Sequence, residues 1–310
     1  MVSIVVAVFN EEKIVLELVK RLENVLNSLG TDYEVIFVDD GSKDKTVELI
    51  EAVHSRNRRL KLVQFSRNFG QVYAIRAGLY YAKGDIVVLM DGDLQDKPEE
   101  IPKLLAKLHE GYDVAYARRI NRQDSFYRKA SSRLFVWMMY FLVPAHELPA
   151  GHELMFAGVF RAMRREVVDA LNSLPERTVY IQGLIHWVGF TSTLVDVEHG
   201  KRTMGRSKWT LMKLLSYALD AIISFSPYPL RKISILGIFI SFVSGFVGVG
   251  YLIQRIFFGT QAVGFTTLVL VILILGGVQL FLFGIIGEYL GRMYIETKRR
   301  PLYIIKKKLI

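Results

Sequence analysis

Two long apolar stretches near the end of the chain constrain its fold more than any other feature. Residues 233–254 carry no charged side chain, and no charge occurs between Arg255 and Glu288, which leaves a second apolar stretch over 265–287. A helix of roughly 20 apolar residues crosses the hydrocarbon core of a bilayer, which is about 30 Å thick. We therefore expect two transmembrane helices in a hairpin, although a buried core helix can be equally apolar. The net charge of +10 and the mean hydropathy of +0.27 are consistent with this prediction. The charged and the strongly apolar segments lie in different parts of the 310 residues.

Basic residues flank this hairpin on one side. Arg231 and Lys232 precede the first stretch, residues 298–308 (KRRPLYIIKKK) follow the second, and the connection holds only Arg255. Since Lys and Arg remain on the cytoplasmic side, we predict a multi-pass protein of the cell membrane with both termini and the N-terminal domain in the cytoplasm. The basic tail suits anionic lipid headgroups, and a solvated charge run is the alternative. The chain has no cysteine, which excludes disulfides and thiolate chemistry.

Strand-like and helix-like patterns alternate over the first 120 residues. The strand-like segments are 3–9, 34–38, 61–65, 86–90 and 113–117, and the helix-like segments are 12–29, 46–53 and 73–82. This alternation predicts an α/β domain with a mostly parallel sheet covered on both faces. No G-x-G-x-x-G motif follows the first strand, so a dinucleotide site is not expected.

The chain divides into four predicted regions. They are a cytoplasmic domain (1–204), an interfacial amphipathic region (205–232), the transmembrane hairpin (233–290, with helices over about 233–254 and 265–287) and a basic cytoplasmic tail (291–310). The segments 124–143 and 206–225 look amphipathic, so each can lie in the membrane interface or pack on the sheet.

An acidic cluster follows the apolar run 87–90. In MDGDLQD, Asp91 and Asp93 are two residues apart, which places both carboxylates on one face of an extended strand. Carboxylates held side by side repel each other, and a divalent cation relieves that repulsion. Gln95 completes a D-x-D-x-Q set of oxygen donors suited to Mg²⁺ or Mn²⁺, ions that commonly serve phosphates. An ordinary Asp-Gly turn is the alternative.

Several motifs in order resemble a known family. They are AVFNEE, VDDGSKDKT, SRNFGQ, MDGDLQDKPEE, KRTMGRSKW, the two apolar stretches and GEYLGR-x₈-RPLY. Over nearly its whole length the chain resembles the membrane-anchored polyprenyl-phosphate glycosyltransferases of glycosyltransferase family 2. This group includes bactoprenol glucosyltransferases, dolichol-phosphate mannose synthases and undecaprenyl-phosphate aminoarabinose transferases. The resemblance implies a GT-A catalytic domain, which is Rossmann-like with a mostly parallel sheet, followed by interfacial helices and two transmembrane helices.

The resemblance assigns nucleotide-sugar contacts to residues at the ends of the first two strands. These are Ala7, Phe9, Glu11 and Asp40, where Ala7 departs from the usual Pro and Phe9 from the commoner Tyr. Asp39 ends the same strand as Asp40, where a carboxylate can accept hydrogen bonds from a base or ribose.

The acidic cluster would hold the donor diphosphate. The resemblance places Asp91, Gly92 and Asp93 beside it as binding and catalytic residues, with Asp91, Asp93 and Gln95 as ligands of Mg²⁺ or Mn²⁺. The ion would neutralise the leaving nucleoside diphosphate. Arg118 matches a position near the diphosphate, and a solvated surface charge is the alternative.

The acceptor would be bound by the loop HGKRTMGRSKW. A membrane-held polyprenyl phosphate needs cations at the interface, and the resemblance gives Arg202 and Lys208 that role, with Ser207 as a further donor. Anchoring of the same loop to lipid headgroups is compatible with this interpretation.

One stretch departs from the family. Relatives carry a segment like D-T-G-D-F-R with a proposed catalytic base, whereas this chain has FAGVFRAM, with Phe156 and Val159 at the acidic positions. His152 or Glu153 is a candidate substitute. A phosphate nucleophile is already anionic at neutral pH, so a strong base is less necessary.

These patterns predict an inverting transfer of a sugar from UDP-glucose or another UDP-sugar to undecaprenyl phosphate. Four alternatives remain: transfer from GDP-mannose to dolichyl phosphate, a processive polysaccharide synthase, an altered or impaired enzyme, and a non-catalytic membrane protein that binds nucleotide-sugar or lipid. A synthase is disfavoured because QGLIHW (182–187) departs from Q-x-x-R-W. Nucleic acid is disfavoured because the basic residues cluster near the membrane segments. The sequence leaves a homo-oligomer open.

Overall fold

Alternate residues of the central strands pack into two different cores. In the first strand Ile4 and Val6 belong to one core and Val5 to the other, and in the second strand Phe37 and Ile36 divide in the same way. This period of two is the mark of a sheet buried on both faces. The computed structural model describes residues 1–119, 158–175, 181–198, 200, 228–258 and 264–310.

The described residues form an eight-stranded sheet in the order β7-β5-β6-β4-β1-β2-β3-β8. Its strands are β1 (Val2–Val8), β2 (Tyr33–Asp39), β3 (Leu60–Phe65), β4 (Ile86–Asp91), β5 (Val114–Arg119), β6 (Arg161–Arg164), β7 (Ser192–Val197) and β8 (Ile305–Leu309). The β1–β2, β1–β4, β2–β3 and β5–β7 pairs are parallel. β6 and β8 pair antiparallel with their neighbours. The predicted mostly parallel α/β domain is confirmed.

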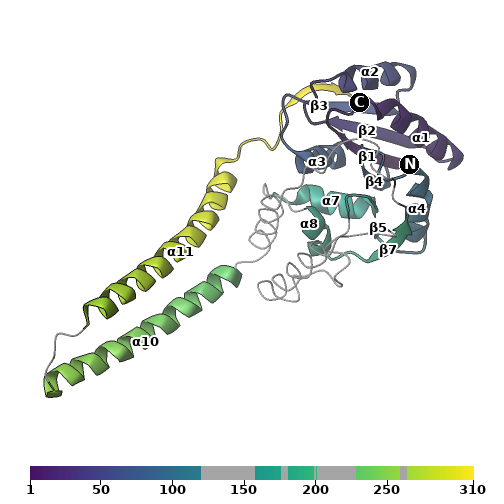
Figure 1. Ribbon diagram of the computed structural model, residues 1–310. Coiled ribbons are helices and arrows are strands. Elements are labelled where there is room, and N and C mark those ends of the chain that lie inside the picture. Colours follow the sequence, from purple (N-terminus) through teal and green to yellow (C-terminus); the bar gives the residue numbers. More distant parts are fainter. Residues whose placement is uncertain (120–157, 176–180, 199, 201–227, 259–263) are drawn as a thin grey trace.

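Helices cover both faces of this sheet (Figure 1). One face carries α1 (Val15–Ser28), α2 (Thr46–Arg56), the 3-10 helix η1 (Pro98–Glu100) and α4 (Ile101–His109). The other carries α3 (Gln71–Tyr81), α7 (Arg165–Ser173) and α8 (Ile181–Trp187). The predicted helices are present with small shifts at their ends, because an apolar period locates a helix better than its termini.

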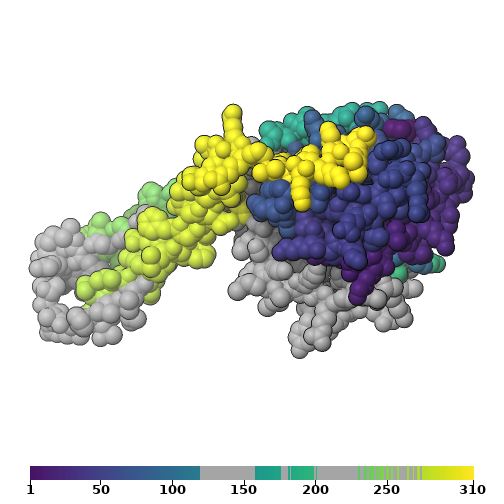
Figure 2. All heavy atoms as spheres, turned by 90° about the horizontal axis from the view of Figure 1, so that it is seen from above, coloured from purple at the N-terminus to yellow at the C-terminus, as the bar shows by residue number. Residues whose placement is uncertain are grey.

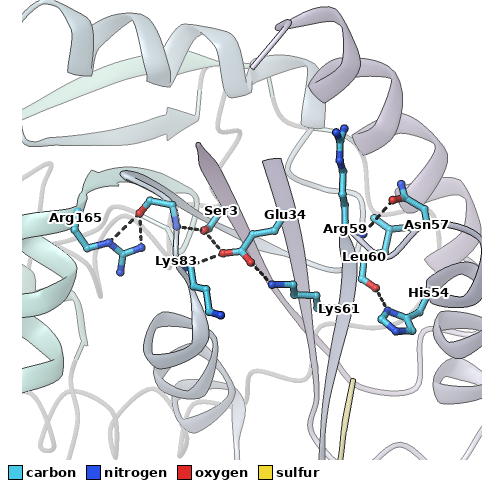
Figure 3. A network of polar contacts seen from close by, with 10 residues as sticks. Ser3, Glu34, His54, Asn57, Arg59, Leu60, Lys61, Lys83 and Arg165 are labelled. Atoms are coloured by element: carbon cyan, nitrogen blue, oxygen red, sulfur yellow. Dashed lines mark hydrogen bonds and ion pairs between the residues drawn. The ribbon is translucent and has the colours of Figure 1, made fainter. Parts of the chain in front are cut away.

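A buried polar network ties together the amino-terminal ends of the strands. Figure 3 shows Ser3, Lys61 and Lys83 arranged around Glu34. The Glu34 carboxylate accepts hydrogen bonds from Ser3 Oγ, Lys61 Nζ and the Lys83 backbone amide, each at 2.6 Å. Burial alone would raise the pKa of Glu34, but these three donors outweigh it and hold the pKa below its usual value. The network lies at the sheet edge opposite the acidic cluster and is therefore structural.

Two long helices, α10 (Tyr228–Phe258) and α11 (Phe265–Lys298), form a hairpin that projects from the domain (Figure 1). Many of their large apolar side chains are exposed, such as Phe246 at 77% and Leu280 at 74%. Among the described residues, one segment, Ile274–Lys298, is long and apolar enough to cross a membrane, and a shorter apolar segment, Gly237–Val247, lies in α10. One possible span is thus supported, and the second stays a prediction.

The end of the chain differs from the predicted basic tail. α11 continues beyond residue 290 and ends at Lys298. Its C-cap, Arg299, adopts a left-handed conformation (φ 47°) two residues before Pro301. A proline disfavours the helical conformation at the residue before it, which explains why α11 ends shortly before Pro301. The chain then returns to the domain, where β8 pairs with β3, and Figure 2 shows these last residues lying across the domain surface. The region over 291–310 is therefore no separate tail, because backbone pairing places its last strand in the sheet.

The two predicted interfacial segments, 124–143 and 206–225, lie outside the described residues.

Candidate active site

The carboxyl ends of β1, β2 and β4 meet at one edge of the sheet. Because these strands are parallel and in register, Val8 lies beside Asp39, and Ala7 lies beside Asp91. β1 lies between β2 and β4, because β2 and β3 are added on one side of β1 and the chain then crosses over to add β4 on the other side. Open α/β sheets bind ligands at such a switch point. The structure thus brings the residues predicted on these three strands to one place.

Close packing shapes the acidic loop after β4. A β-carbon at Gly92 would lie 2.8 Å from Cγ1 of Val8 and 2.9 Å from the carbonyl oxygen of Ala7. Only glycine therefore lets the loop approach β1 so closely. Leu94 has a φ of 60°, which turns the chain sharply between Asp93 and Gln95. Gly92 is thus required for this packing, and its contact with a nucleotide-sugar stays a prediction.

The acidic side chains are held by hydrogen bonds. Gln71 Nε2, on the first residue of α3, donates to Asp91 Oδ1 at 2.6 Å. The Asp91 amide donates to the buried Asp96 carboxylate at 3.4 Å. The backbone amide of Gln95 donates to Asp93 Oδ1 at 3.1 Å.

The donor set around Asp93 fits a hard divalent cation that also binds phosphate. Asp93 is half-buried, and among the described residues its Oδ2 has no protein hydrogen bond. No three His, Cys, Asp or Glu side chains in the described ranges converge to hold a metal by themselves. Mg²⁺ in particular commonly takes one or two carboxylates and completes its shell with water and substrate phosphate oxygens. Asp91, Asp93 and Gln95 could hold such an ion.

Asp39 and Asp40 bind neighbouring loops within the protein. Asp39 is fully buried and accepts the Ser42 amide at 3.1 Å. Asp40 is 4% exposed and accepts the amides of Phe69 at 2.7 Å and Gly70 at 2.9 Å. Burial raises the pKa of both carboxyls, although these backbone donors oppose it. Both residues hold loops at the candidate site, and their contact with a nucleotide stays a prediction.

The loop after β1 is fastened to the loop after β2. Asn10 adopts a positive φ of 58°. Its backbone amide donates to Ser42 Oγ, and its side-chain oxygen Oδ1 accepts a hydrogen bond from the backbone amide of Lys43, both at 2.9 Å. The Glu11 amide donates to Thr46 Oγ1 at 2.8 Å. The predicted nucleotide residues Phe9 and Glu11 therefore lie on a well-anchored loop at the same edge.

Arg118 pairs with a carboxylate on the neighbouring strand. β5 and β7 run parallel with Arg118 beside Asp196, and the guanidinium Nε lies 2.5 Å from Asp196 Oδ1. This Arg118 contact lowers the pKa of Asp196. The predicted diphosphate contact of Arg118 would therefore compete with Asp196.

The segment before the predicted lipid-phosphate loop docks on the acidic loop. The Gly200 amide donates to the Gln95 carbonyl oxygen at 2.9 Å, and Lys97 Nζ lies 2.7 Å from Glu198 Oε2. The lipid-phosphate residues themselves lie outside the described residues; they are Arg202, Ser207 and Lys208. The described contacts nevertheless place the entry to that loop beside the candidate metal site.

The stretch that departs from the family is only partly described. Val159 is half-buried against the core, and its carbonyl oxygen accepts Arg161 Nε at 3.0 Å. Arg161, on β6, is fully buried with its guanidinium 4.9 Å from the Tyr116 ring. Phe156, together with the candidate substitutes His152 and Glu153, lies outside the described residues.

Sequence reasoning missed the side chains that support the site. Gln71, Asn10 and Thr46 orient the acidic and nucleotide loops, yet none was predicted as a site residue. The available signal was position, because each lies in a motif that directly follows a strand of the parallel sheet.

Comparison with known proteins identifies the family. Residues 3–171 match the family described as glycosyl transferase family 2. The chain is 42% identical over 303 residues to an uncharacterized glycosyltransferase of Synechocystis sp., covering 98% of this chain and 94% of the relative. The chain belongs to glycosyltransferase family 2. As a family member it is a glycosyltransferase enzyme, as the motifs indicated.

Two further known proteins are similar to this chain. The SfII prophage-derived bactoprenol glucosyl transferase of Shigella flexneri is 37% identical over 306 residues, which cover 99% of this chain and 97% of that protein. Among solved structures, glucosyl-3-phosphoglycerate synthase from Mycobacterium tuberculosis, in complex with Mn²⁺, UDP and glucosyl-3-phosphoglycerate, matches with a TM-score of 0.50 and 22% identity. The structural match covers 72% of this chain and 77% of the synthase chain, and it supports a GT-A type fold.

Proposed function

We propose that this enzyme transfers a sugar from a nucleotide-sugar to a polyprenyl phosphate at the cytoplasmic face of the cell membrane. UDP-glucose or another UDP-sugar is the proposed donor, and undecaprenyl phosphate is the proposed acceptor. The product would be a polyprenyl-phosphate sugar that feeds glycan or cell-envelope modification.

One observation carries this proposal: a GT-A type domain and an exposed apolar helix hairpin occur together in one chain. Apolar side chains that cover α10 and α11 are stable in lipid, so the enzyme would work beside the membrane. A lipid-linked acceptor suits that location. Relatives named bactoprenol glucosyl transferase, similar over nearly the full length, support the same acceptor class.

The proposed reaction is a displacement with inversion. A phosphate oxygen of the lipid attacks the anomeric carbon, a new carbon–oxygen bond forms, and the bond to the nucleoside diphosphate breaks with its electron pair on the diphosphate oxygen. Asp91 and Asp93 would hold the metal, with Gln95 as a further ligand. The bound cation supplies neutralisation of the leaving group's negative charge.

The chain's own residues would position the two substrates. The loops held by Asp39 and Asp40 would place the nucleoside near Ala7, Phe9 and Glu11. Arg202, Ser207 and Lys208 would hold the acceptor phosphate. That phosphate is ionised at neutral pH, so Val159 at an acidic family position is compatible with catalysis.

The metal and the membrane arrangement are also part of the proposal. Either Mg²⁺ or Mn²⁺ fits the oxygen donors, and Mn²⁺ with UDP has a precedent in the solved synthase of similar fold. α10 and α11 would both span the bilayer, with the sheet and both chain ends on the cytoplasmic side.

The test is a transfer assay with the purified full-length protein in detergent. Undecaprenyl phosphate or dolichyl phosphate is mixed with radiolabelled UDP-sugars and GDP-mannose, with Mg²⁺, Mn²⁺ or EDTA. We expect metal-dependent label in the organic phase from one UDP-sugar. Label from GDP-mannose with dolichyl phosphate would favour the alternative donor and acceptor. No transfer from any donor would overturn the proposed activity.

A further inference from the structure

The segment that follows α11 reaches the candidate donor site through a continuous series of contacts. Only residues 299–302 separate the end of α11 from Tyr303. The Tyr303 ring stacks on Phe65 with a centroid distance of 4.7 Å and an interplanar angle of 13°. Next to this contact, the Ser66 amide donates to the Ile304 carbonyl oxygen at 2.9 Å. The chain end is therefore joined to the carboxyl end of β3.

The contacts continue from β3 into the loop over 66–70. The Phe65 ring meets Phe69 edge-to-face at 5.7 Å, and the Arg67 guanidinium lies 4.1 Å from the Phe69 ring centroid. Phe69 and Gly70 then donate their backbone amides to Asp40. This loop thus lies between Tyr303 on one side and a predicted nucleotide residue on the other.

The same loop leads to the candidate metal site. It ends at Gly70, and the next residue is Gln71, whose amide nitrogen Nε2 donates to Asp91. The loop is also packed against the turn after β2, because a β-carbon at Gly41 would lie 2.4 Å from the Arg67 carbonyl carbon. With so little free space, a displacement of the loop must move its neighbours.

β8 fixes Tyr303 in place. It pairs with β3 over four register positions, from Leu62 beside Leu309 to Phe65 beside Ile305. Lys307 Nζ also lies 2.7 Å from Glu51 Oε1 on α2. Burial, with Tyr81 and Tyr80 nearby, raises the pKa of Tyr303 to about 12.

We infer that Tyr303 is a positioning residue of the donor site, which acts through Phe65 and Phe69 on the loop that binds Asp40. In this arrangement the segment after α11 forms part of the catalytic domain, and it ties donor binding to the placement of the membrane helix. The inference rests on the proposed function, because it requires a nucleotide-sugar at the carboxyl edge of the sheet.

The test compares Tyr303→Ala with Tyr303→Phe in the full-length protein. Tyr303→Phe keeps the stacked ring, and Tyr112→Ala removes a partly exposed ring elsewhere on the domain. The first measurement is amide hydrogen exchange at Phe69 and Gly70 without ligand. The second is the Kd of UDP with Mn²⁺ by calorimetry, together with the KM values for donor and acceptor.

We expect Tyr303→Ala to speed exchange at both amides and to weaken UDP binding about three- to ten-fold, as for loss of one aromatic pair. The donor KM should rise with it, the acceptor KM should not change, and Tyr303→Phe should match wild type. A lower melting temperature with unchanged exchange and UDP affinity would overturn the inference, because Tyr303 would then only cover the sheet edge.

Failure of the proposed function gives a different result. In that case the wild type transfers no sugar from any donor, whereas failure of the inference leaves wild-type transfer intact and Tyr303→Ala equal to it. Unchanged exchange at Phe69 and Gly70 in Tyr303→Ala overturns the inference whichever donor the enzyme uses.

Discussion

At the scale of single residues, the candidate site depends on a few oxygen atoms at the ends of parallel strands. Asp91 ends β4 and Asp93 lies in the loop that follows it, and each is oriented by a different hydrogen bond. Their positions follow from the register of β4 against β1 and from the absence of a side chain at Gly92. The roles of these side chains can therefore be tested by substitutions that keep the side-chain volume and remove one charge or one hydrogen bond.

Asp93→Asn tests the carboxylate. The substitution keeps the volume and removes the charge, so we expect transfer to fall about 100-fold or more with little change in stability, because charge stabilisation of the leaving group is lost. Initial rates over a range of Mn²⁺ concentrations measure the effect. Asp32→Asn is the matched control, since Asp32 is exposed and its carboxylate lies 3.5 Å from Arg59, away from the candidate site. Wild-type rates in Asp93→Asn would remove this residue from the site.

Gln71→Leu tests the support of Asp91. Removal of the amide donor leaves Asp91 without its 2.6 Å hydrogen bond from Gln71, so we expect kcat/KM for the donor to fall about 10-fold. The thermal stability should stay close to wild type, because Gln71 is exposed. Steady-state kinetics with varied donor separate the two effects. An unchanged kcat/KM would show that the orientation of Asp91 does not depend on Gln71.

At the scale of elements, the two ends of the sheet have different roles. The carboxyl ends carry the acidic loops, whereas the amino-terminal ends are joined by the network around Glu34 (Figure 3). Breaking a buried ion pair leaves one charge uncompensated and costs about 3–5 kcal/mol. The stability of the sheet should therefore be sensitive at the end that carries no site residues.

Glu34→Gln tests this network. The carboxyl is 4% exposed and pairs with Lys61, so we expect its neutralisation to lower the melting temperature by about 6–20 °C at pH 7. Thermal unfolding in detergent measures the change. Glu110→Gln serves as the control, because Glu110 is exposed and its carboxylate forms a surface ion pair with Lys107.

The same variant gives a pH dependence. The folded pKa of Glu34 lies below its ordinary value of 4.5, so its contribution to stability is fully present above that pH and is lost as the pH falls through the folded value. The difference in melting temperature between wild type and Glu34→Gln should therefore shrink below about pH 4. A difference that stays constant down to pH 3 would contradict this linkage.

At the scale of the whole molecule, the chain leaves the domain through α10 and returns to it through α11 and β8. β1 and β8 belong to one sheet, so both ends of the chain lie in one domain (Figures 1 and 2). If α10 and α11 both cross the bilayer, the connection at 259–263 lies on the opposite side from that domain.

Cysteine labelling in cells tests this topology. The chain has no native cysteine, so single substitutions can be labelled without background. We expect Thr260→Cys to react with a membrane-impermeant maleimide in intact cells, and Asp32→Cys to react only after permeabilisation. Protection of both positions in intact cells would contradict a hairpin that spans the membrane.

How much could be predicted from the sequence differs between local and long-range features. The strands, most of the helices and the acidic loop follow from short patterns, because burial on alternate residues or on one helix face is written in neighbouring positions. The partner of Arg118 could not be predicted, since Asp196 lies far along the chain and meets it only through the β5–β7 register. Gln71 was missed because its partner, Asp91, lies 20 residues further along the chain.

The sequence by itself determined a mostly parallel α/β domain, a cluster of carboxylates at the end of β4, membership of glycosyltransferase family 2 and an apolar hairpin near the chain's end. Only the tertiary structure decided that residues 305–309 complete the sheet and that Tyr303 stacks on Phe65, which in turn contacts Phe69 in the loop held by Asp40. The physical reason is that a basic strand at a sheet edge has the composition of a solvated tail. Its place is set by backbone pairing with β3, which no local pattern encodes.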